Sequence, residues 1–477
     1  MATKRKQPDS DATPNFNHKI PASIMTPDEV STSLGTLRFF DGLPDDATVQ
    51  KVYDNLDTMR AVEVFLDFVP LASVEALHRG FQDLGVDACH KIILFSDLMD
   101  SSSLFLTGNT DTVYAIGFLN LKRDGPTVVE VPPGAGPGTV NDAFFRFVVD
   151  MGAPGPDRGK GGKYLLAFRL FHHRACLGGE APVPAEYFVK KSPTYVNWLP
   201  LRGFMKDGGT AAAVKMVFNT IHANDVSFYR EIDAVIQREP IDALPAEIRG
   251  NLAAIGMQRG KRFAPDERMQ RLLVDAVAIG NATARSIAFR PRSETIWYYG
   301  RESSWFTAFD GGDYQWLVDN GNGGRNKDAR TLFFYIATVN TPAMVLKMVG
   351  MGSQYALAAT DSEKRYLDGS KTYKVVIPAD APVKDFWSLV VYDPQTRSML
   401  QTSQPYPSKN SERNEDMVKG SDGSTTIWFG PKAPNGCEKN WVQTVPGKGW
   451  FLCLRLYGPL QTWFDKTWRP SEIELVA

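Results

Sequence analysis

Residues 109–131 read NTDTVYAIGFLNLKRDGPTVVEV, and this stretch decides the expected fold. A polar string at 109–114 leads into an apolar run that is predicted to be a β-strand from Thr112 to Leu121. A Gly-Pro turn follows, and Thr127–Val131 has the pattern of a second strand. Strand geometry places Thr112 and Tyr114 on one face. Both faces of the first strand are largely apolar, which is expected of a strand that is covered on both sides.

Short β-type runs separated by Gly- and Pro-rich segments recur in two parts of the chain. The remaining predicted strands are Ala143–Val149, Tyr164–Phe171, Tyr373–Ile377, Phe386–Tyr392, Thr425–Phe429 and Trp450–Tyr457. Regular short strands with turn signals favour antiparallel sandwiches over a βαβ sheet. The expected fold class is therefore α+β and β-rich, with two antiparallel β-sandwich domains and interleaved helices.

Apolar residues at three- and four-residue spacing predict the helices. Those expected after residue 210 are Val214–Ile236, Asp266–Ile287 and Asp328–Met348. Two earlier helices, one from about Asp45 and one from about Ala72 to Leu84, are expected to pair. The predicted organisation is a disordered tail (1–24), an N-terminal helical hairpin (25–88), a first β-sandwich (89–206), a helical linker with an aromatic loop (207–351) and a second β-sandwich (352–477).

Composition excludes several classes of function. The 477 residues include 53 basic and 54 acidic side chains, and the net charge of −1 gives no field that would gather nucleic acid or an anionic membrane. A run of 18 apolar residues is missing, so no membrane span is expected. The polar N-terminus lacks an apolar signal core, which favours a cytoplasmic protein. A homo-oligomer is compatible with these features.

Metal and nucleophile motifs are sparse. The four cysteines form no CxxC pair, and His172-His173 would point to opposite faces of a strand. Neither HExxH nor GxSxG is present. No motif requires a cofactor. A calcium or magnesium ion held by Asp and Asn oxygens is still compatible with the sequence.

The polar string supplies the first candidate site. Asp111 is predicted as a general base or metal ligand and Tyr114 as a catalytic group that orients the substrate, with Asn109 and Thr112 as substrate-binding neighbours. The alternative is an Asx-type turn, in which Asn109 and Asp111 bind backbone amides before the strand. If Asp111 is catalytic, Asp111→Asn should abolish turnover and change stability by at most about 1 kcal/mol.

Three further regions are predicted to contribute to substrate binding. Arg455 lies in an apolar strand and would anchor a substrate carboxylate, or else form a buried structural ion pair. Thr194 and Arg202 belong to a segment expected at the same cleft. Trp305 represents an aromatic, Gly-rich loop at 290–326, where aromatic rings either stack on a flat ligand or pack in the core.

Two groups of motifs resemble the two-part family in which a DUF1254 region precedes a DUF1214 region. The first group is Asn109–Tyr114, Gly125-Pro126, Val129–Pro132, Pro193-Thr194 and Leu201-Arg202. The second is Tyr366–Ser370, Phe386–Ser388, Tyr392-Asp393, Asn440-Trp441, Arg455–Tyr457, Pro459 and Trp468–Pro470. The resemblance covers roughly residues 45–475 and departs from the family pattern at 143–181. It implies paired jelly-roll-like sandwiches with accessory helices, and it carries no established activity.

The leading functional hypothesis is a small-molecule enzyme, most plausibly a hydrolase, with its site in the cleft between the two β-domains. The alternative is a non-catalytic protein that binds an aromatic ligand or a glycan. A mainly structural protein is the third hypothesis. The partner expected in the first two cases is a small-molecule ligand.

Overall fold

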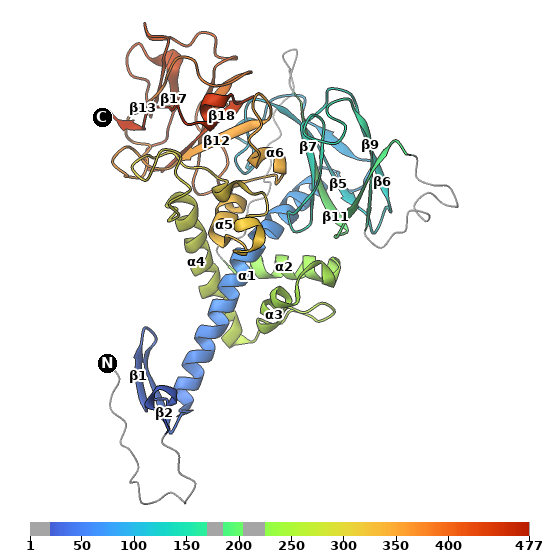
Figure 1. Ribbon diagram of the computed structural model, residues 1–477, viewed down its shortest axis with the longest axis vertical. Coiled ribbons are helices and arrows are strands. Elements are labelled where there is room, and N and C mark those ends of the chain that lie inside the picture. The colour runs from blue at the N-terminus through green and yellow to red at the C-terminus, as the bar shows by residue number, and fades with distance from the viewer. Residues whose placement is uncertain (1–19, 169–184, 204–224, 477) are drawn as a thin grey trace, which may run out of the picture.

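The computed structural model describes residues 20–168, 185–203 and 225–476. Two β-rich lobes lie side by side at one end of the molecule, with a group of helices beneath them (Figure 1). One long helix, α1, runs from a small N-terminal sheet at the far end up to the lobes. The chain thus forms a stem that carries two β-domains.

The first β-domain contains two sheets. One has the strand order β4-β5-β11-β7-β8 and the other has the order β10-β9-β6. The five strands of the larger sheet are β4 (Ile92–Leu94), β5 (Val113–Asn120), β7 (Gly138–Asp142), β8 (Phe147–Met151) and β11 (Val196–Gly203). Those of the smaller sheet are β6 (Thr127–Val131), β9 (Gly162–Phe168) and β10 (Tyr187–Ser192). Apolar side chains from both sheets form one buried cluster.

The second β-domain also has two sheets, with the orders β12-β18-β14-β15 and β17-β16-β13-β19. The first is built from β12 (Ser353–Ala358), β14 (Trp387–Tyr392), β15 (Ser408–Asn410) and β18 (Phe451–Tyr457). The second is built from β13 (Tyr373–Ile377), β16 (Thr425–Gly430), β17 (Trp441–Gln443) and β19 (Glu474–Leu475). A second buried cluster joins these sheets.

These sheets confirm a mixed α+β fold with several antiparallel sheets, and they correct one detail of the prediction. Most strand pairs are antiparallel, but β10 pairs with β9 and β17 pairs with β16 in parallel. The predicted strand Ala143–Val149 is also divided, because residues 143–146 form the turn between β7 and β8. Phe145 in that turn has a φ of 63°, a conformation that no strand contains.

The predicted N-terminal helical hairpin is wrong. Residues 46–83 form one helix of 38 residues, α1 (Asp46–Asp83), with Asp45 as its N-cap. Pro70 lies inside α1, and a proline removes one backbone donor from a helix. Most residues around Pro70 are buried against other elements, so tertiary packing keeps the helix continuous there. A small sheet precedes α1: β1 (Glu29–Thr32), β2 (Gly35–Phe40) and β3 (Leu43–Pro44).

Four helices pack around α1: α2 (Ser227–Arg238), α3 (Ala246–Ala254), α4 (Glu267–Phe289) and α5 (Lys327–Ile336). The short helix α6 (Pro342–Val345) lies against β12, and α7 (Gln461–Phe464) contributes Trp463 to the core of the second β-domain. The predicted helix Asp328–Met348 is thus split into α5 and α6. Within the described residues, α4 alone has the length and apolar content of a membrane span, and about a third of that window is buried. One such helix is weak evidence for a membrane span, and Gly280 of α4 lies against Phe65 of α1.

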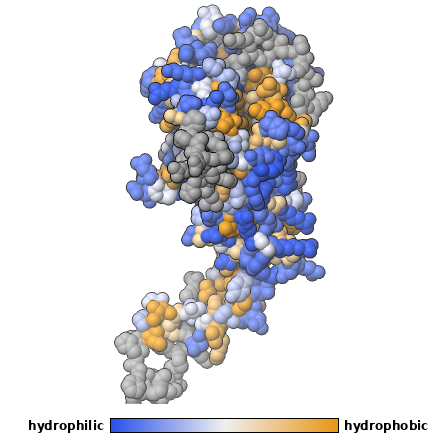
Figure 2. All heavy atoms as spheres, turned by 90° about the vertical axis from the view of Figure 1, so that its right-hand side faces the viewer, coloured by the Kyte–Doolittle hydropathy of each residue, from blue (hydrophilic) through white to orange (hydrophobic). Residues whose placement is uncertain are grey.

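The stem, formed by the small N-terminal sheet and the adjoining end of α1, exposes apolar side chains. Phe40 and Leu43 of the small sheet and Tyr53 and Met59 of α1 are more than half exposed. Figure 2 shows apolar atoms gathered on this narrow end of the molecule. By contrast, the largest buried cluster joins α1, α4 and α5 to one face of β5 and one face of β18. The opposite face of each strand packs against the other sheet of its own domain. The two domains and the helices therefore share one central core.

Candidate ligand pocket between the two domains

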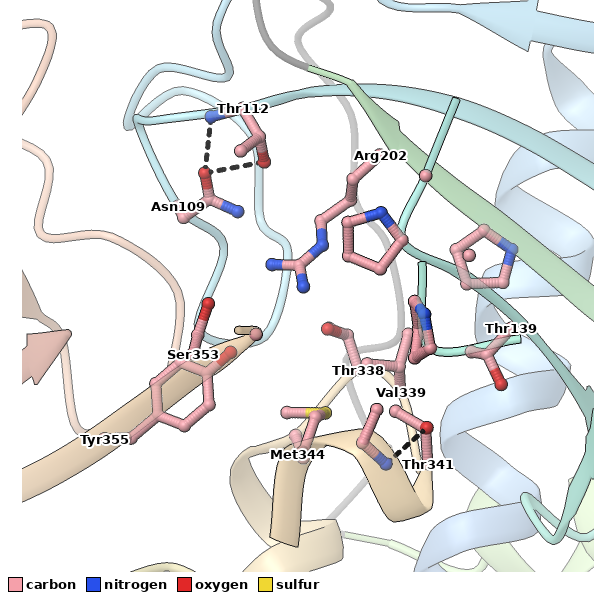
Figure 3. Close-up of a pocket in the computed structure, with 18 of the residues that line it drawn as sticks. Asn109, Thr112, Thr139, Arg202, Thr338, Val339, Thr341, Met344, Ser353 and Tyr355 are labelled. Atoms are coloured by element: carbon pink, nitrogen blue, oxygen red, sulfur yellow. Dashed lines mark hydrogen bonds between the residues drawn. The ribbon is translucent and has the colours of Figure 1, made fainter. Parts of the chain in front are cut away.

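A cavity of about 410 Å³ lies between one face of the five-stranded sheet of the first domain and one face of the sheet β12-β18-β14-β15 of the second. One side of it is lined by Tyr114 of β5 and by the alternate residues Trp198, Pro200 and Arg202 of β11. Alternate residues of β12 and β18 line it from the other. The register pairs Ser353 with Tyr457, Tyr355 with Arg455, and Leu357 with Cys453, and all six face the cavity. Ile336–Met344, which joins α5 to α6, contributes the floor (Figure 3).

Arg455 is a buried cation at this pocket. Its Nη2 donates to the carbonyl oxygen of Thr107 at 2.6 Å and to the hydroxyl of Tyr392 at 2.7 Å. The guanidinium lies over the ring of Tyr355, 5.3 Å from its centroid. Its Nε has no hydrogen-bond partner, and no ion pair joins Arg455 to a carboxylate within the described ranges. The predicted structural ion pair is therefore missing from the described part of the chain.

Arg202 is the second cation of the pocket. Its side chain extends from β11 toward the side of the cavity where Asn109, Ser353 and Tyr355 lie (Figure 3). Arg202 makes no side-chain hydrogen bond or ion pair to the residues that the structure describes. Arg202 and Arg455 are close enough to repel each other electrostatically. An anion bound between two guanidinium groups removes such repulsion and accepts hydrogen bonds from both.

The polar string 109–114 serves two purposes. The Oδ1 of Asn109 accepts hydrogen bonds from the backbone nitrogens of Asp111 and Thr112, both at 2.8 Å, and from the Thr112 hydroxyl at 3.1 Å. This is the predicted Asx-type turn. The Asn109 amide also donates to the Tyr114 hydroxyl, which lines the pocket. Burial raises the pKa of Tyr114, so this hydroxyl keeps its proton at neutral pH.

Asp111 connects the two domains. Its carboxylate accepts hydrogen bonds from Ser388 at 2.7 Å, Asn410 at 2.8 Å and Tyr457 at 3.0 Å, and Arg413 lies 3.4 Å away. All four partners belong to the second β-domain. Asp111 is not among the residues that line the cavity, and it reaches the cavity only through Tyr457. Its catalytic role stays a prediction, whereas its structural role is visible in these contacts.

Thr194 and Trp305, predicted as substrate-binding, lie elsewhere. Thr194 is fully buried in the turn before β11, where its hydroxyl donates to the carbonyl oxygen of Val196 and accepts from the backbone nitrogen of Ala143. Trp305 is fully buried in the core of the second domain, and its Nε1 donates to the carbonyl oxygen of Ser471. Neither side chain has a surface left for a ligand.

Sequence reasoning missed Asp150. This residue of β8 lines the cavity, is 7% exposed, and accepts a hydrogen bond from the Thr341 hydroxyl at 2.6 Å. Burial raises its pKa to about 6, although hydrogen bonds from Thr341 and Thr139 oppose the shift. The available signal was an acidic residue in the otherwise apolar strand 147–151, because a carboxylate rarely occupies such a position without a purpose.

The described residues contain no group of three or more His, Cys, Asp or Glu side chains arranged to hold a metal ion. His172 and His173 lie outside the described residues. The strongest chemical feature of the described pocket is therefore its pair of arginines, next to several tyrosine hydroxyls and an apolar wall.

This fold and pocket define a class of two-domain α+β proteins with a ligand-sized cavity between the domains. Two family models match the chain: DUF1254 over residues 91–224 and DUF1214 over residues 352–461, each described as a protein of unknown function. Together they cover slightly more than half of the sequence. The chain belongs to the family that joins these two domains, as the motifs around Asn109 and Arg455 predicted. No curated protein matches it.

Two solved structures resemble the chain. The VPA0106 protein from Vibrio parahaemolyticus is 17% identical with a TM-score of 0.50, and the match covers 89% of this chain and 100% of that one. An uncharacterised protein from Burkholderia cenocepacia is 12% identical with a TM-score of 0.38, over 90% and 97% of the two chains. At 17% identity, the first similarity supports the fold alone.

Proposed function

We propose that this protein binds a small organic acid in the pocket between its two domains, with the carboxylate held by Arg202 and Arg455. The observation that carries the proposal is the half-buried guanidinium of Arg202, which has no hydrogen-bond or ion-pair partner among the described residues and faces a cavity that also contains the buried Arg455. Removing a cation from water without a counterion is costly, and a ligand carboxylate offsets that cost. The cavity volume is within the range of small-molecule sites.

The rest of the lining suits an acid with an apolar body. Phe105, Phe309 and Phe333 line the cavity together with Met344 and Met348. Methionine side chains adapt to irregular apolar shapes, and phenylalanine rings supply large apolar surfaces. An inorganic anion would leave these surfaces unused. This supports an organic ligand, in line with the small-molecule partner expected from the sequence.

The test is isothermal titration calorimetry of the full chain with carboxylic acids of graded size, each paired with its neutral primary amide. Acids are expected to bind and amides to bind at least about tenfold more weakly, because a charge-assisted hydrogen bond contributes about 1.5–3 kcal/mol. Arg202→Gln is expected to weaken acid binding by about 10- to 100-fold. Inorganic phosphate serves as the comparison anion.

Arg301→Gln is the matched control, since Arg301 is exposed, pairs with Glu294 and lies outside the pocket. It is expected to leave acid binding unchanged. Equal affinity of acids and amides, or full acid binding by a well-folded Arg202→Gln variant, would contradict the proposal.

A hydrolase that acts on an ester or amide of such an acid is the second candidate. It is favoured by the hydrogen bond from Tyr457, which lines the pocket, to Asp111. In this mechanism water attacks the carbonyl carbon, which Tyr114 orients, and Tyr457 relays one proton of that water to Asp111. The acyl C–O or C–N bond then breaks, and Asp111 returns the proton through Tyr457 to the leaving alcohol or amine. The test is release of free acid from ester and amide derivatives. Retention of this activity in Tyr457→Phe would exclude the relay.

We also propose that each of the two β-domains is a jelly-roll-like sandwich. Each β-domain contributes eight strands in two sheets, the number typical of a jelly roll. The parallel pairs β10/β9 and β17/β16 depart from an all-antiparallel pattern.

A further inference from the structure

The pocket has two polar ends, which we call its poles: the first is formed by Arg202 and Arg455, and the second lies at Asp150. On the sheet β5-β11-β7-β8, Arg202 pairs with Tyr114, and Asp150 pairs with Thr139. The pairing of Leu201 with Gly138 places Thr139 next to Pro200, one side-chain row along from Arg202. Asp150 is thus two strands away from Arg202 across the sheet, and it is displaced by two residues along the strand direction. Standard strand spacings put their Cα atoms roughly 12 Å apart on the same face.

The two poles point away from each other. Figure 3 shows the Arg202 guanidinium directed toward Tyr355 and Asn109, whereas Thr139 and Thr341, the hydroxyl neighbours of Asp150, lie on the opposite side. The wall between them includes Pro200, Val339 and Met344. A ligand that reaches both poles is therefore an elongated molecule with an apolar middle.

Asp150 lacks a cationic partner. It forms no ion pair within the described part of the chain, and its polar side-chain neighbours there are the hydroxyls of Thr341 and Thr139. Thr341 donates its hydroxyl hydrogen to Asp150 and accepts from the backbone nitrogen of Ala343, so it has no further hydrogen to donate to a ligand. A carboxylate oxygen accepts more than one hydrogen bond. Asp150 therefore retains acceptor capacity for a donor inside the cavity.

We infer that the bound acid carries a hydrogen-bond donor, a hydroxyl or an ammonium group, at the end opposite its carboxylate, and that Asp150 accepts it. This inference rests on the proposed function, because it assumes that Arg202 and Arg455 hold the carboxylate. The apolar middle of the pocket contacts the carbon skeleton. The ligand class is thus an ω-hydroxy or ω-amino organic acid.

The experiment compares straight-chain carboxylic acids of equal length that end in methyl, hydroxyl or ammonium, across several lengths, by calorimetry with the full chain. One donor-bearing series is expected to bind at least about tenfold more tightly than the methyl series, the effect of one buried hydrogen bond to a charged acceptor. The hydroxyl and ammonium arms identify which donor is used. Asp150→Leu is expected to abolish the preference.

Asp150→Asn is the second variant, since it retains an acceptor oxygen for Thr341 if the leucine variant does not fold. It is expected to abolish a preference for ammonium. Asp83→Asn is the matched control, because Asp83 is exposed at the end of α1 and lies outside the cavity lining. It should leave the preference unchanged. Equal binding of all three end groups, or a preference that survives in folded Asp150→Leu, overturns the inference and leaves acid binding intact. Absence of binding by every acid overturns both proposals.

Discussion

Replacement of Asp111 by asparagine is expected to destabilise the junction between the two domains. The change removes the negative charge and half of the acceptor capacity of a carboxylate that is 8% exposed. If the new amide oxygen faces Ser388 and Tyr457, the new amide nitrogen faces the donors of Asn410 and Arg413. Asn410 cannot rotate to relieve this clash without loss, because its own oxygen accepts from the backbone nitrogens of Glu412 and Arg413.

The magnitude follows from these contacts. Each hydrogen bond to a buried charged group contributes about 1.5–3 kcal/mol, and Asp111→Asn loses the equivalent of one to two such bonds. The expected loss is therefore about 2–4 kcal/mol. Asp111→Ala, which leaves Ser388, Asn410 and Tyr457 without their acceptor, is expected to lose about 3–5 kcal/mol. These values replace the expectation, based on sequence, that Asp111→Asn changes stability by at most about 1 kcal/mol.

The assay is urea unfolding of the full chain, followed by tryptophan fluorescence. Arg413→Gln is the control, because Arg413 is about one-third exposed and 3.4 Å from Asp111, and its loss is expected to cost less than about 1 kcal/mol. A double-mutant cycle of Asp111→Ala with Ser388→Ala isolates the coupling across the junction. An Asp111→Asn variant that unfolds at the same urea concentration as the parent would refute the structural role.

Three other predictions concern packing, the pocket floor and pH. Gly280→Ala places a Cβ 2.5 Å from the Phe65 ring and is expected to cost about 1–3 kcal/mol, whereas Gly250→Ala meets nothing within 4 Å and is expected to gain about 0.5–1 kcal/mol, both by urea unfolding. Asn141→Ala leaves the backbone nitrogen and oxygen of Asn340 unpaired; it is expected to cost about 2–3 kcal/mol and to weaken acid binding in calorimetry, and unchanged values would contradict this. Burial raises the pKa of Glu231 to about 7. Between about pH 4.5 and 7 the folded chain therefore holds a proton that the unfolded chain has released, and the free energy of unfolding falls as pH rises through this window. Glu231→Gln should remove a pH-dependent difference on the order of 3 kcal/mol, read from melting temperatures on both sides of the window.

The strands with clear alternation were predictable from sequence. Tyr373–Ile377 and Thr127–Val131 have the predicted bounds, β5 is one residue shorter than predicted at each end, and β18 begins one residue later than predicted. β11 was not predicted, because Pro200 in its middle lacks the backbone donor that a central strand normally uses. β11 nevertheless lies between β5 and β7, and it carries Arg202.

The candidate site was half predictable. Arg455 was identified from its charge in an apolar run, Tyr114 from strand alternation and Arg202 from the Leu201-Arg202 motif of the family resemblance, and all three line the pocket. Asp150 and Tyr355 were not, since their importance depends on the way two sheets from distant parts of the chain face each other. Sequence patterns report which face of one strand a residue occupies, and they do not report which other sheet that face meets.

The contacts of Asp111 have a consequence for synthesis of the chain. Ser388, its nearest partner, is 277 residues further along, and Tyr457 is 346 residues away. During translation the first domain therefore emerges with this carboxylate still open to water, and the junction closes only after Ser388 and Tyr457 have been synthesised. A prematurely terminated chain therefore exposes the surface around Asp111 that the second domain would otherwise cover. This exposed surface distinguishes incomplete chains from finished ones, and proteases act preferentially on chains that are incompletely folded.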